Sequence, residues 1–188
     1  MMIESGYLKN HFLIAMPALA APDFFHTVTY ICEHNSDGAM GIVINRPLTL
    51  SLGEILHQLD LQASTPACAL QPIYLGGPLH RERVFVIHEL PWQGELTLPV
   101  NDSIGVTASR DILSAMAQGE YTGQTLVALG YAGWSEGQLE QEIAANAWLC
   151  QEADPRILFD TPDERRWQEA ATLLGIDISR LSSEVGHA

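Results

Sequence analysis

The alternation of apolar and polar residues along the chain predicts a protein built largely of strands. Two apolar runs, residues 28–32 and 40–44, flank a polar turn at residues 35–38. The Asp-Gly pair in this turn supplies the positive φ angles that a tight turn needs, so the pattern indicates a β-hairpin. The second strand then leads into Asn45 and Arg46, and we expect the proline that follows them to end the strand. The hairpin therefore delivers two polar side chains at its end.

Other apolar runs predict the rest of the sheet and its helices. The continuous run at residues 125–131 is typical of a central strand that is buried on both faces. Apolar residues at helical spacing predict the helices. We expect further strands at residues 12–16, 73–75, 83–88, 104–107, 148–150 and 156–159, and helices at residues 48–61, 109–117, 138–146 and 163–174.

These elements predict an α/β fold of the α+β-like kind in a single domain. Strands outnumber helices and alternate with them only in part, which favours a mixed β-sheet core of about six to eight strands with three to four flanking helices. A chain of 188 residues is long enough for one such core. We expect residues 1–160 to form the α/β domain and residues 161–188 to add a C-terminal helix and a loose tail packed on it.

The charge of the chain argues against nucleic acid as a direct partner. Nine lysines and arginines face 23 acidic residues, for a formal net charge of −14. Such a field repels a phosphate backbone. The close basic pairs are Arg81 with Arg83 and Arg165 with Arg166, which is too few for a basic stripe. We therefore do not expect direct nucleic-acid binding.

Cysteine usage and hydropathy predict a cytoplasmic protein. Cys32, Cys68 and Cys150 are odd in number and far apart, which suits a reducing compartment better than a disulfide framework. Residues 12–20 imitate a secretory signal, but a proline interrupts this short run, and we interpret residues 12–16 as a buried strand. No apolar run approaches the ~20 residues of a membrane-spanning helix, so no membrane association is expected.

Metal-binding and catalytic motifs do not stand out. Cys32 and His34 lie two residues apart and would share one face of a strand. A buried cysteine with a structural role is the favoured interpretation, because no paired-cysteine or His-Glu-x-x-His spacing accompanies them. No nucleophile elbow or nucleotide-binding loop is present either. We expect no metal and no cofactor, and we leave enzymatic activity open while favouring its absence.

Two polar turns are candidates for binding an anion. Gly76 and Gly77 expose backbone that a ligand can approach closely, although a tight turn between strands is the simpler interpretation. Arg46 can clamp a carboxylate or phosphate with its planar guanidinium, against the alternative of a structural ion pair with one of the many acids. The anion hypothesis gains weight if these two turns lie beside each other.

Four sequence blocks together resemble the AlgH/YqgE family of bacterial proteins. They are FLIAMPAL, ICEHNSDGAMGIVINRP, YLGGPL followed by RVFVIH, and GYAGWSEGQLEQEI. They occur in the family's order and span roughly residues 6–159. The resemblance implies an α/β fold of its own kind without a recognised DNA-binding motif. The family takes its name from a proposed role in transcriptional regulation of alginate production.

The resemblance also implies which positions form the family signature, without giving them roles. The candidate ligand- or partner-binding residues are Asn45, Arg46, Gly76, Gly77, His88, Trp134, Gln138 and Glu142.

Two hypotheses for the function follow, and a third, direct transcriptional regulation, rests on the family name alone. The first is a cytoplasmic regulatory module that binds an unknown small anionic ligand or a protein partner and does not itself grip DNA. The alternative is an enzyme acting on a small anionic substrate, with Arg46 holding the substrate and His88 or Glu142 in acid–base catalysis.

Overall fold

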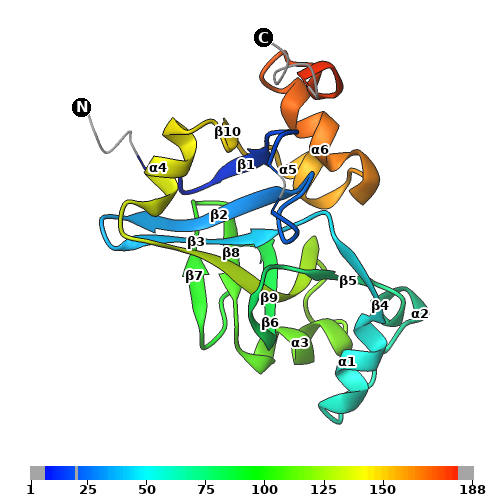
Figure 1. Cartoon of the computed structure of the whole chain (residues 1–188). Helices are drawn as coiled ribbons and strands as arrows, with labels where there is room; N and C mark the ends of the chain where they lie inside the picture. Colours follow the sequence, from blue (N-terminus) through cyan, green and yellow to red (C-terminus); the bar gives the residue numbers. More distant parts are fainter. Residues whose placement is uncertain (1–6, 20, 182–188) are drawn as a thin grey trace.

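The computed structural model describes residues 7–19 and 21–181, which form one curled sheet with helices packed against it (Figure 1). The ten strands are β1 (His11–Ala15), β2 (Val28–Asn35), β3 (Gly38–Val43), β4 (Pro47–Ser51), β5 (Pro72–Leu75), β6 (Leu79–Glu89), β7 (Thr97–Pro99), β8 (Ile104–Thr107), β9 (Thr125–Ser135) and β10 (Trp148–Glu152). The helices are α1 (Leu52–Gln58), α2 (Pro66–Ala69), α3 (Arg110–Ala117), α4 (Gln138–Ala144), α5 (Pro155–Phe159), α6 (Asp163–Thr172) and the 3₁₀ helix η2 (Ile178–Leu181).

The topology confirms the predicted α/β fold with a mixed sheet. The main path runs β10-β1-β2-β3-β9-β6-β8-β7, and β5 joins β9 while β4 joins β5. The pairing of β5 with β9 is parallel, and the other pairings within the described residues are antiparallel. Strands and helices are both more numerous than expected because several are very short, such as β7 and α2.

Strand β9 holds the sheet together, as expected for the apolar run at residues 125–131. One side of β9 pairs with β5 near its start and with β3 near its end, while the other side pairs with β6. Val127 and Ala128 are fully buried, although they point to opposite faces. Burial on both faces explains why the sequence here is continuously apolar.

The sheet curls so that one of its faces packs partly on itself and partly on α5 and α6. The other face is covered by helices that lie apart from one another. Phe12 and Ile14 of β1 join the large inner cluster, whereas their neighbours Leu13 and Ala15 join a smaller cluster beneath α4. A third cluster lies where α1 and α3 cover β5, β6 and β9. The alternation along β1 confirms the predicted buried strand, which spans His11–Ala15 rather than residues 12–16.

The predicted hairpin is present as β2 and β3, but its end differs from the expectation. Asn35 pairs with Gly38 across the turn, and Gly38 has a φ of 139°. Strand β3 ends at Val43, and Pro47 does not end a strand: it is the first residue of β4 and pairs with Tyr74. Proline is tolerated there because β4 lies at an edge and requires no hydrogen bond from that nitrogen.

Two other element predictions were wrong in part. Residues 156–159 form helix α5 rather than a strand, because Asp154 caps the backbone N–H of Arg156 and Pro155 occupies the first helical position. The predicted helix at residues 48–61 is shorter and follows strand β4. It begins at Leu52 after Ser51 and Glu54 form a capping box.

Within residues 7–19 and 21–181, no helix combines the length and apolar character that are needed to cross a membrane.

Candidate functional site

The eight candidate residues form three groups, and each group lies next to a different part of β9. His88 pairs with Thr125 at the start of the strand. Gly76 donates its N–H to the carbonyl of Leu129 near the middle (2.7 Å). Trp134 lies near the end of β9, nine residues beyond Thr125 and therefore on the order of 30 Å along an extended strand. The structure distributes these residues along β9 and does not gather them around one centre.

Asn45 and Arg46 both hold backbone at the end of the hairpin. The side chain of Asn45 accepts the N–H of Val28 and donates to the carbonyl of His26 (both 2.9 Å). The Nη2 of Arg46 donates to the carbonyls of Pro22 (2.8 Å) and Phe25 (3.2 Å). Arg46 therefore fastens the loop before β2 through carbonyls, rather than through the ion pair considered from the sequence.

Gly76 and Gly77 lie beside the Asn45–Arg46 turn, as the anion hypothesis required. The carbonyl of Arg46 accepts the N–H of Leu75 (2.8 Å), and the carbonyl of Gly76 accepts the N–H of Val43 (2.8 Å). However, the glycines are needed for another reason. A Cβ atom on Gly77 would overlap the backbone of Tyr131, and one on Gly76 would overlap the carbonyl of Gly130. Both glycines let the chain cross β9 closely.

His88 is fully buried and held by neutral hydrogen bonds. Its Nε2 lies 2.6 Å from the Thr107 hydroxyl and its Nδ1 lies 3.1 Å from the Glu89 carbonyl. Because a carbonyl only accepts, Nδ1 carries the proton and Nε2 accepts from Thr107. Burial lowers the pKa of His88 below its ordinary value of 6.5. The imidazole is therefore neutral at pH 7.

Trp134, Gln138 and Glu142 form one hydrogen-bonded group at the end of β9. One carboxylate oxygen of Glu142 accepts the indole N–H of Trp134 and that of Trp148 (both 2.9 Å). The other oxygen accepts the side-chain amide of Gln138 (2.9 Å). Both indoles are buried, so Glu142 satisfies two donors that would otherwise be stranded. This group fixes α4 on the sheet.

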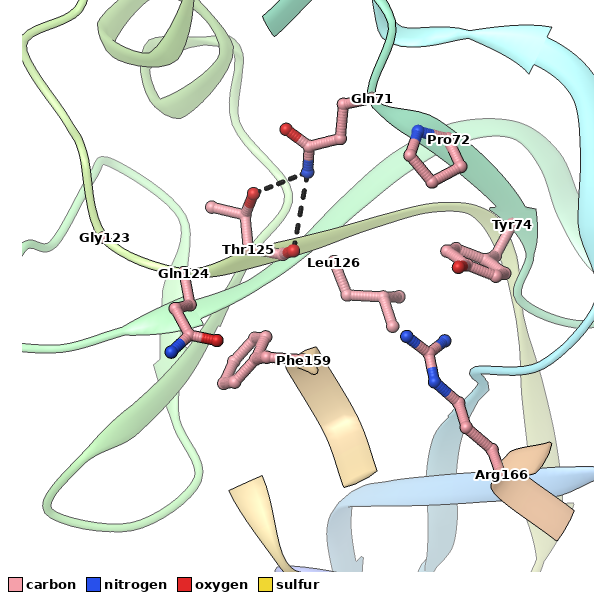
Figure 2. Close-up of a pocket in the computed structure, with 9 residues that line it drawn as sticks. All are labelled: Gln71, Pro72, Tyr74, Gly123, Gln124, Thr125, Leu126, Phe159 and Arg166. Atoms are coloured by element: carbon pink, nitrogen blue, oxygen red, sulfur yellow. Dashed lines mark hydrogen bonds between the residues drawn. The ribbon is translucent and has the colours of Figure 1, made fainter. Parts of the chain in front are cut away.

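A polar cavity of about 340 Å³ lies elsewhere, where β5 and β9 meet α5 and α6. Arg166 extends from α6 toward Tyr74 and Leu126, and Gln71 and Gln124 lie on the other side (Figure 2). Gln71 is fixed there, because its amide donates to the Thr125 hydroxyl (2.6 Å). The residues that line the cavity are Gln71, Pro72, Tyr74, Gly123, Gln124, Thr125, Leu126, Phe159 and Arg166.

Arg166 is the one charged residue in this lining, and it is only 5% exposed. Its Nε donates to the Thr161 carbonyl (2.9 Å), its Nη1 donates to the Ile44 carbonyl, and its guanidinium lies 5.1 Å from the centre of the Tyr74 ring. No carboxylate of the described residues lies within 4 Å of its nitrogens. Burial raises the pKa of Tyr74, so its hydroxyl is a neutral neighbour of the guanidinium.

A buried guanidinium without a carboxylate beside it is costly in free energy, and an anion in the cavity would offset that cost. Arginine stays charged at any physiological pH, so it cannot escape the cost of burial by losing a proton. Carbonyl dipoles and an aromatic ring compensate the charge only in part. The Nη2 atom is not used to hold either carbonyl and is the natural donor to a ligand. The charge and the polar lining of the cavity are therefore of the kind that suits a small carboxylate or phosphate.

Sequence reasoning did not select Arg166, although it noted the Arg165–Arg166 pair. The available signal was helical spacing. Arg166 lies four residues before Ala170, which is fully buried, so both face the core. Arg165, one position earlier, is exposed. An arginine on the apolar face of an amphipathic helix is a specific sign of a buried charge.

Comparison with known proteins assigns the chain to a family. The model of a family described as AlgH-like matches residues 12–179. The chain belongs to the AlgH-like family. A UPF0301 protein of Nitrosococcus oceani is 54% identical to it over 182 residues, covering 97% of each chain. A UPF0301 protein of Thioalkalivibrio sulfidiphilus is 52% identical over 187 residues, covering 100% of each chain.

A solved structure also matches this AlgH-like protein along its whole length. The solution structure of the AlgH protein from Pseudomonas aeruginosa is 48% identical, covers 100% of both chains and superposes with a TM-score of 0.80. The family resemblance and the α/β fold inferred from the sequence are thereby confirmed.

Proposed function

We propose that this AlgH-like protein is a cytoplasmic regulatory module that binds a small anionic ligand in the Arg166 cavity. The observation that carries the proposal is the buried guanidinium of Arg166, which lines a polar cavity and has no carboxylate beside it in the described chain. A carboxylate or phosphate supplies the missing negative charge and accepts from Nη2. A volume of about 340 Å³ suits a ligand at the small end of the usual range.

The lining favours binding over catalysis. Arg166, Tyr74, Thr125 and two glutamines supply donors and acceptors, but the lining contains no carboxylate, imidazole or thiol. Acid–base and covalent catalysis usually need one of these groups within reach of the substrate. The amide groups of Gln71 and Gln124 instead suit recognition of a polar ligand body.

The regulatory output runs through the end of the hairpin. Arg166 holds the Ile44 carbonyl, and Arg46, two residues later, holds the carbonyls of Pro22 and Phe25. An anion bound at Nη2 repositions the guanidinium whose Nη1 holds the Ile44 carbonyl, and so changes how firmly this loop is held. Phe25 is 50% exposed on the loop and is the natural contact for a protein partner.

Calorimetric titration tests the ligand site, with pyruvate, succinate, benzoate and inorganic phosphate as probes. We expect at least one probe to bind and to raise Tm, since a ligand at 100 times its Kd adds about 2.7 kcal/mol of stability. Arg166→Met should abolish this binding. Arg165→Met is the matched control, because it removes the same charge from the same helix at an exposed position.

Gln124→Ala keeps the test decisive if Arg166→Met does not fold. Gln124 lines the cavity on the protein surface, and its side chain makes no hydrogen bond within the described residues. The Gln124→Ala substitution should weaken binding several-fold without lowering the Tm of the ligand-free protein. Equal binding by the parent protein, Arg166→Met and Gln124→Ala would contradict the proposed site, as would no binding of any probe.

The same proposal holds that the protein does not read DNA itself. With a net charge of −14, few counterions would be released on binding a duplex. A mobility-shift assay at low salt should therefore show no tight complex with any sequence. Sequence-selective binding by the isolated protein would contradict this part of the proposal.

A further inference from the structure

A second hollow, of about 520 Å³, lies on the other side of the turn that precedes β9. Trp92 and Tyr121 form its aromatic wall, with ring centres 5.9 Å apart and ring planes at 66°. Both rings are half-buried, so each keeps part of its surface open. The full lining is Glu89, Leu90, Pro91, Trp92, Glu120, Tyr121, Thr122 and Gly123.

The two rings are held in place from behind. The ring of His88 meets Trp92 edge-on at 5.6 Å and Tyr121 edge-on at 5.8 Å. The Tyr121 hydroxyl accepts the N–H of Glu89 (2.9 Å) and donates to its carbonyl (3.0 Å). His88 is in turn anchored by Thr107. The wall is thus already ordered before a ligand arrives, which reduces the entropy cost of binding.

The hollow is negative as well as aromatic. Glu89 and Glu120 are its charged lining residues, and both are exposed. Neither carboxylate has a lysine, arginine or histidine within 4 Å in the part of the chain that the structure describes. One oxygen of Glu89 accepts the N–H of Gln124 (2.8 Å), which fixes that carboxylate at the rim.

We propose that this hollow binds a small organic cation, specifically an alkylated ammonium group. The faces of tryptophan and tyrosine carry negative potential and attract a cation that packs its methyl groups against them. The two carboxylates add attraction without having to coordinate the ion. A metal ion fits the lining less well, because the described residues contain no group of three or more metal-ligating side chains.

The groups that face the hollow also have suitable protonation states. Burial lowers the pKa of His88, which therefore adds no positive charge behind the rings at neutral pH. Burial raises the pKa of Tyr121, which stays neutral. Glu89 and Glu120 are the remaining titratable groups of the lining. Protonation of His88 at low pH would oppose the cation, so binding should weaken as pH falls below the range in which His88 is neutral.

The proposal for this site does not rest on the Arg166 cavity, and it goes beyond the proposed function. Gly123 lines both spaces, and Gln124 of the anion cavity donates to Glu89 of the cation hollow. The two neighbouring sites have opposite charge. Either one can exist without the other, and each has its own probes and variants.

Titration with choline, monitored by NMR and calorimetry, tests the cation site. Choline should bind with a Kd in the millimolar range, since an exposed cation–π contact is worth only ~0.5–1 kcal/mol. The uncharged isostere 3,3-dimethyl-1-butanol has the same shape but makes no cation–π contact. Each such contact changes the Kd about two- to fivefold, so the loss of contacts with two rings should weaken binding at least about fivefold. The indole N–H signal of Trp92 should shift with choline.

Variants locate the site. Trp92→Leu should weaken choline binding by at least about two- to fivefold, which is the effect of one cation–π contact, and Glu120→Gln should weaken it several-fold. Glu95→Gln is the matched control, because it removes the same charge from the exposed segment between β6 and β7 outside the hollow. If Trp92→Leu does not fold, Glu120→Gln still decides the question. Equal binding of the isostere, or unchanged binding in Glu120→Gln and Trp92→Leu, would overturn the proposal.

Discussion

The side chain of Glu142 contributes an unusually large part of the stability of the region where α4 packs on the sheet. Its carboxylate accepts the indole N–H groups of both Trp134 and Trp148, which are 6% and 4% exposed. Glu142→Ala should lower the free energy of unfolding by about 2–6 kcal/mol, because it strands two buried donors and each costs about 1–3 kcal/mol. Urea denaturation followed by tryptophan fluorescence measures this change.

Two controls separate hydrogen bonding from charge at this position. Glu142→Gln retains one acceptor oxygen and should lose less than Glu142→Ala. Glu136→Ala removes an exposed carboxylate at the start of the same segment and should change stability by less than about 0.5 kcal/mol. If all three variants were equally stable, Glu142 would not have the bracing role that its contacts indicate.

His88 makes stability depend on pH with a definite sign. Its pKa in the folded protein is below 6.5, whereas in the unfolded chain it returns to about that value. As pH falls below 6.5, the unfolded state takes up the proton first, so the free energy of unfolding decreases until pH reaches the lowered folded value. His26, whose pKa burial also lowers, contributes with the same sign.

Urea denaturation between pH 7.5 and 5 checks this dependence. His88→Gln should be less stable at pH 7.5, because it disturbs the buried bond to Thr107, and should show a shallower loss as pH falls. His57→Gln is the control, since His57 is exposed on α1. An unchanged pH slope in His88→Gln would mean that its buried imidazole does not resist protonation.

At the scale of elements, the segment after β5 crosses very close to β9. This close approach requires residues without a side chain at the crossing. Gly77→Ala should prevent folding or cost more than about 3 kcal/mol, because the new Cβ would overlap the backbone of Tyr131, which cannot move without breaking the sheet. Gly137→Ala is the contrast. Gly137 has a φ of 75° but no atom within 4 Å of an added Cβ, so it should cost only about 1–2 kcal/mol.

Soluble expression and thermal unfolding of the two variants provide the comparison. A Gly77→Ala protein as stable as Gly137→Ala would show that the crossing can relax, and that steric exclusion is not why glycine occupies this position.

The elements that the sequence predicted well are those fixed by local chemistry. The hairpin of β2 and β3 followed from its Asp-Gly turn, and β9 from a long apolar run. Short apolar runs are ambiguous between strand and helix, and α5 was assigned wrongly for that reason. Its Asp154-Pro155 start was the local sign of a helix.

The Arg166 cavity could not be predicted in the same way, because no local pattern builds it. Its lining comes from β5, β9, α5 and α6, and the bond from Arg166 to Ile44 joins residues 122 positions apart. The binding roles of the eight predicted residues stay predictions. For Asn45, Arg46 and Glu142, the structure adds specific hydrogen bonds that hold the fold.

At the scale of the whole molecule, the division into residues 1–160 and 161–188 stays a prediction. The contacts of α6 indicate whether residues 1–160 should fold without that helix. Ala170 and Ala171 are fully buried in the same cluster as Phe12 and Tyr30. The indole of Trp167 donates to the Ala15 carbonyl (2.9 Å), which lies 152 positions away. Helix α6 therefore closes the inner face of the sheet rather than lying on a finished domain.

A chain that ends at residue 160 should accordingly fail to fold cooperatively. It would expose the inner cluster and leave the Ala15 and Ile44 carbonyls without their partners on α6. Each stranded carbonyl costs ~1–3 kcal/mol, and the lost apolar burial adds to that, which together rivals the 5–15 kcal/mol that stabilises a typical domain. The full chain should show one calorimetric transition. A truncated protein that unfolded with the same Tm would establish residues 1–160 as a self-sufficient domain, with α6 added only to place Arg166.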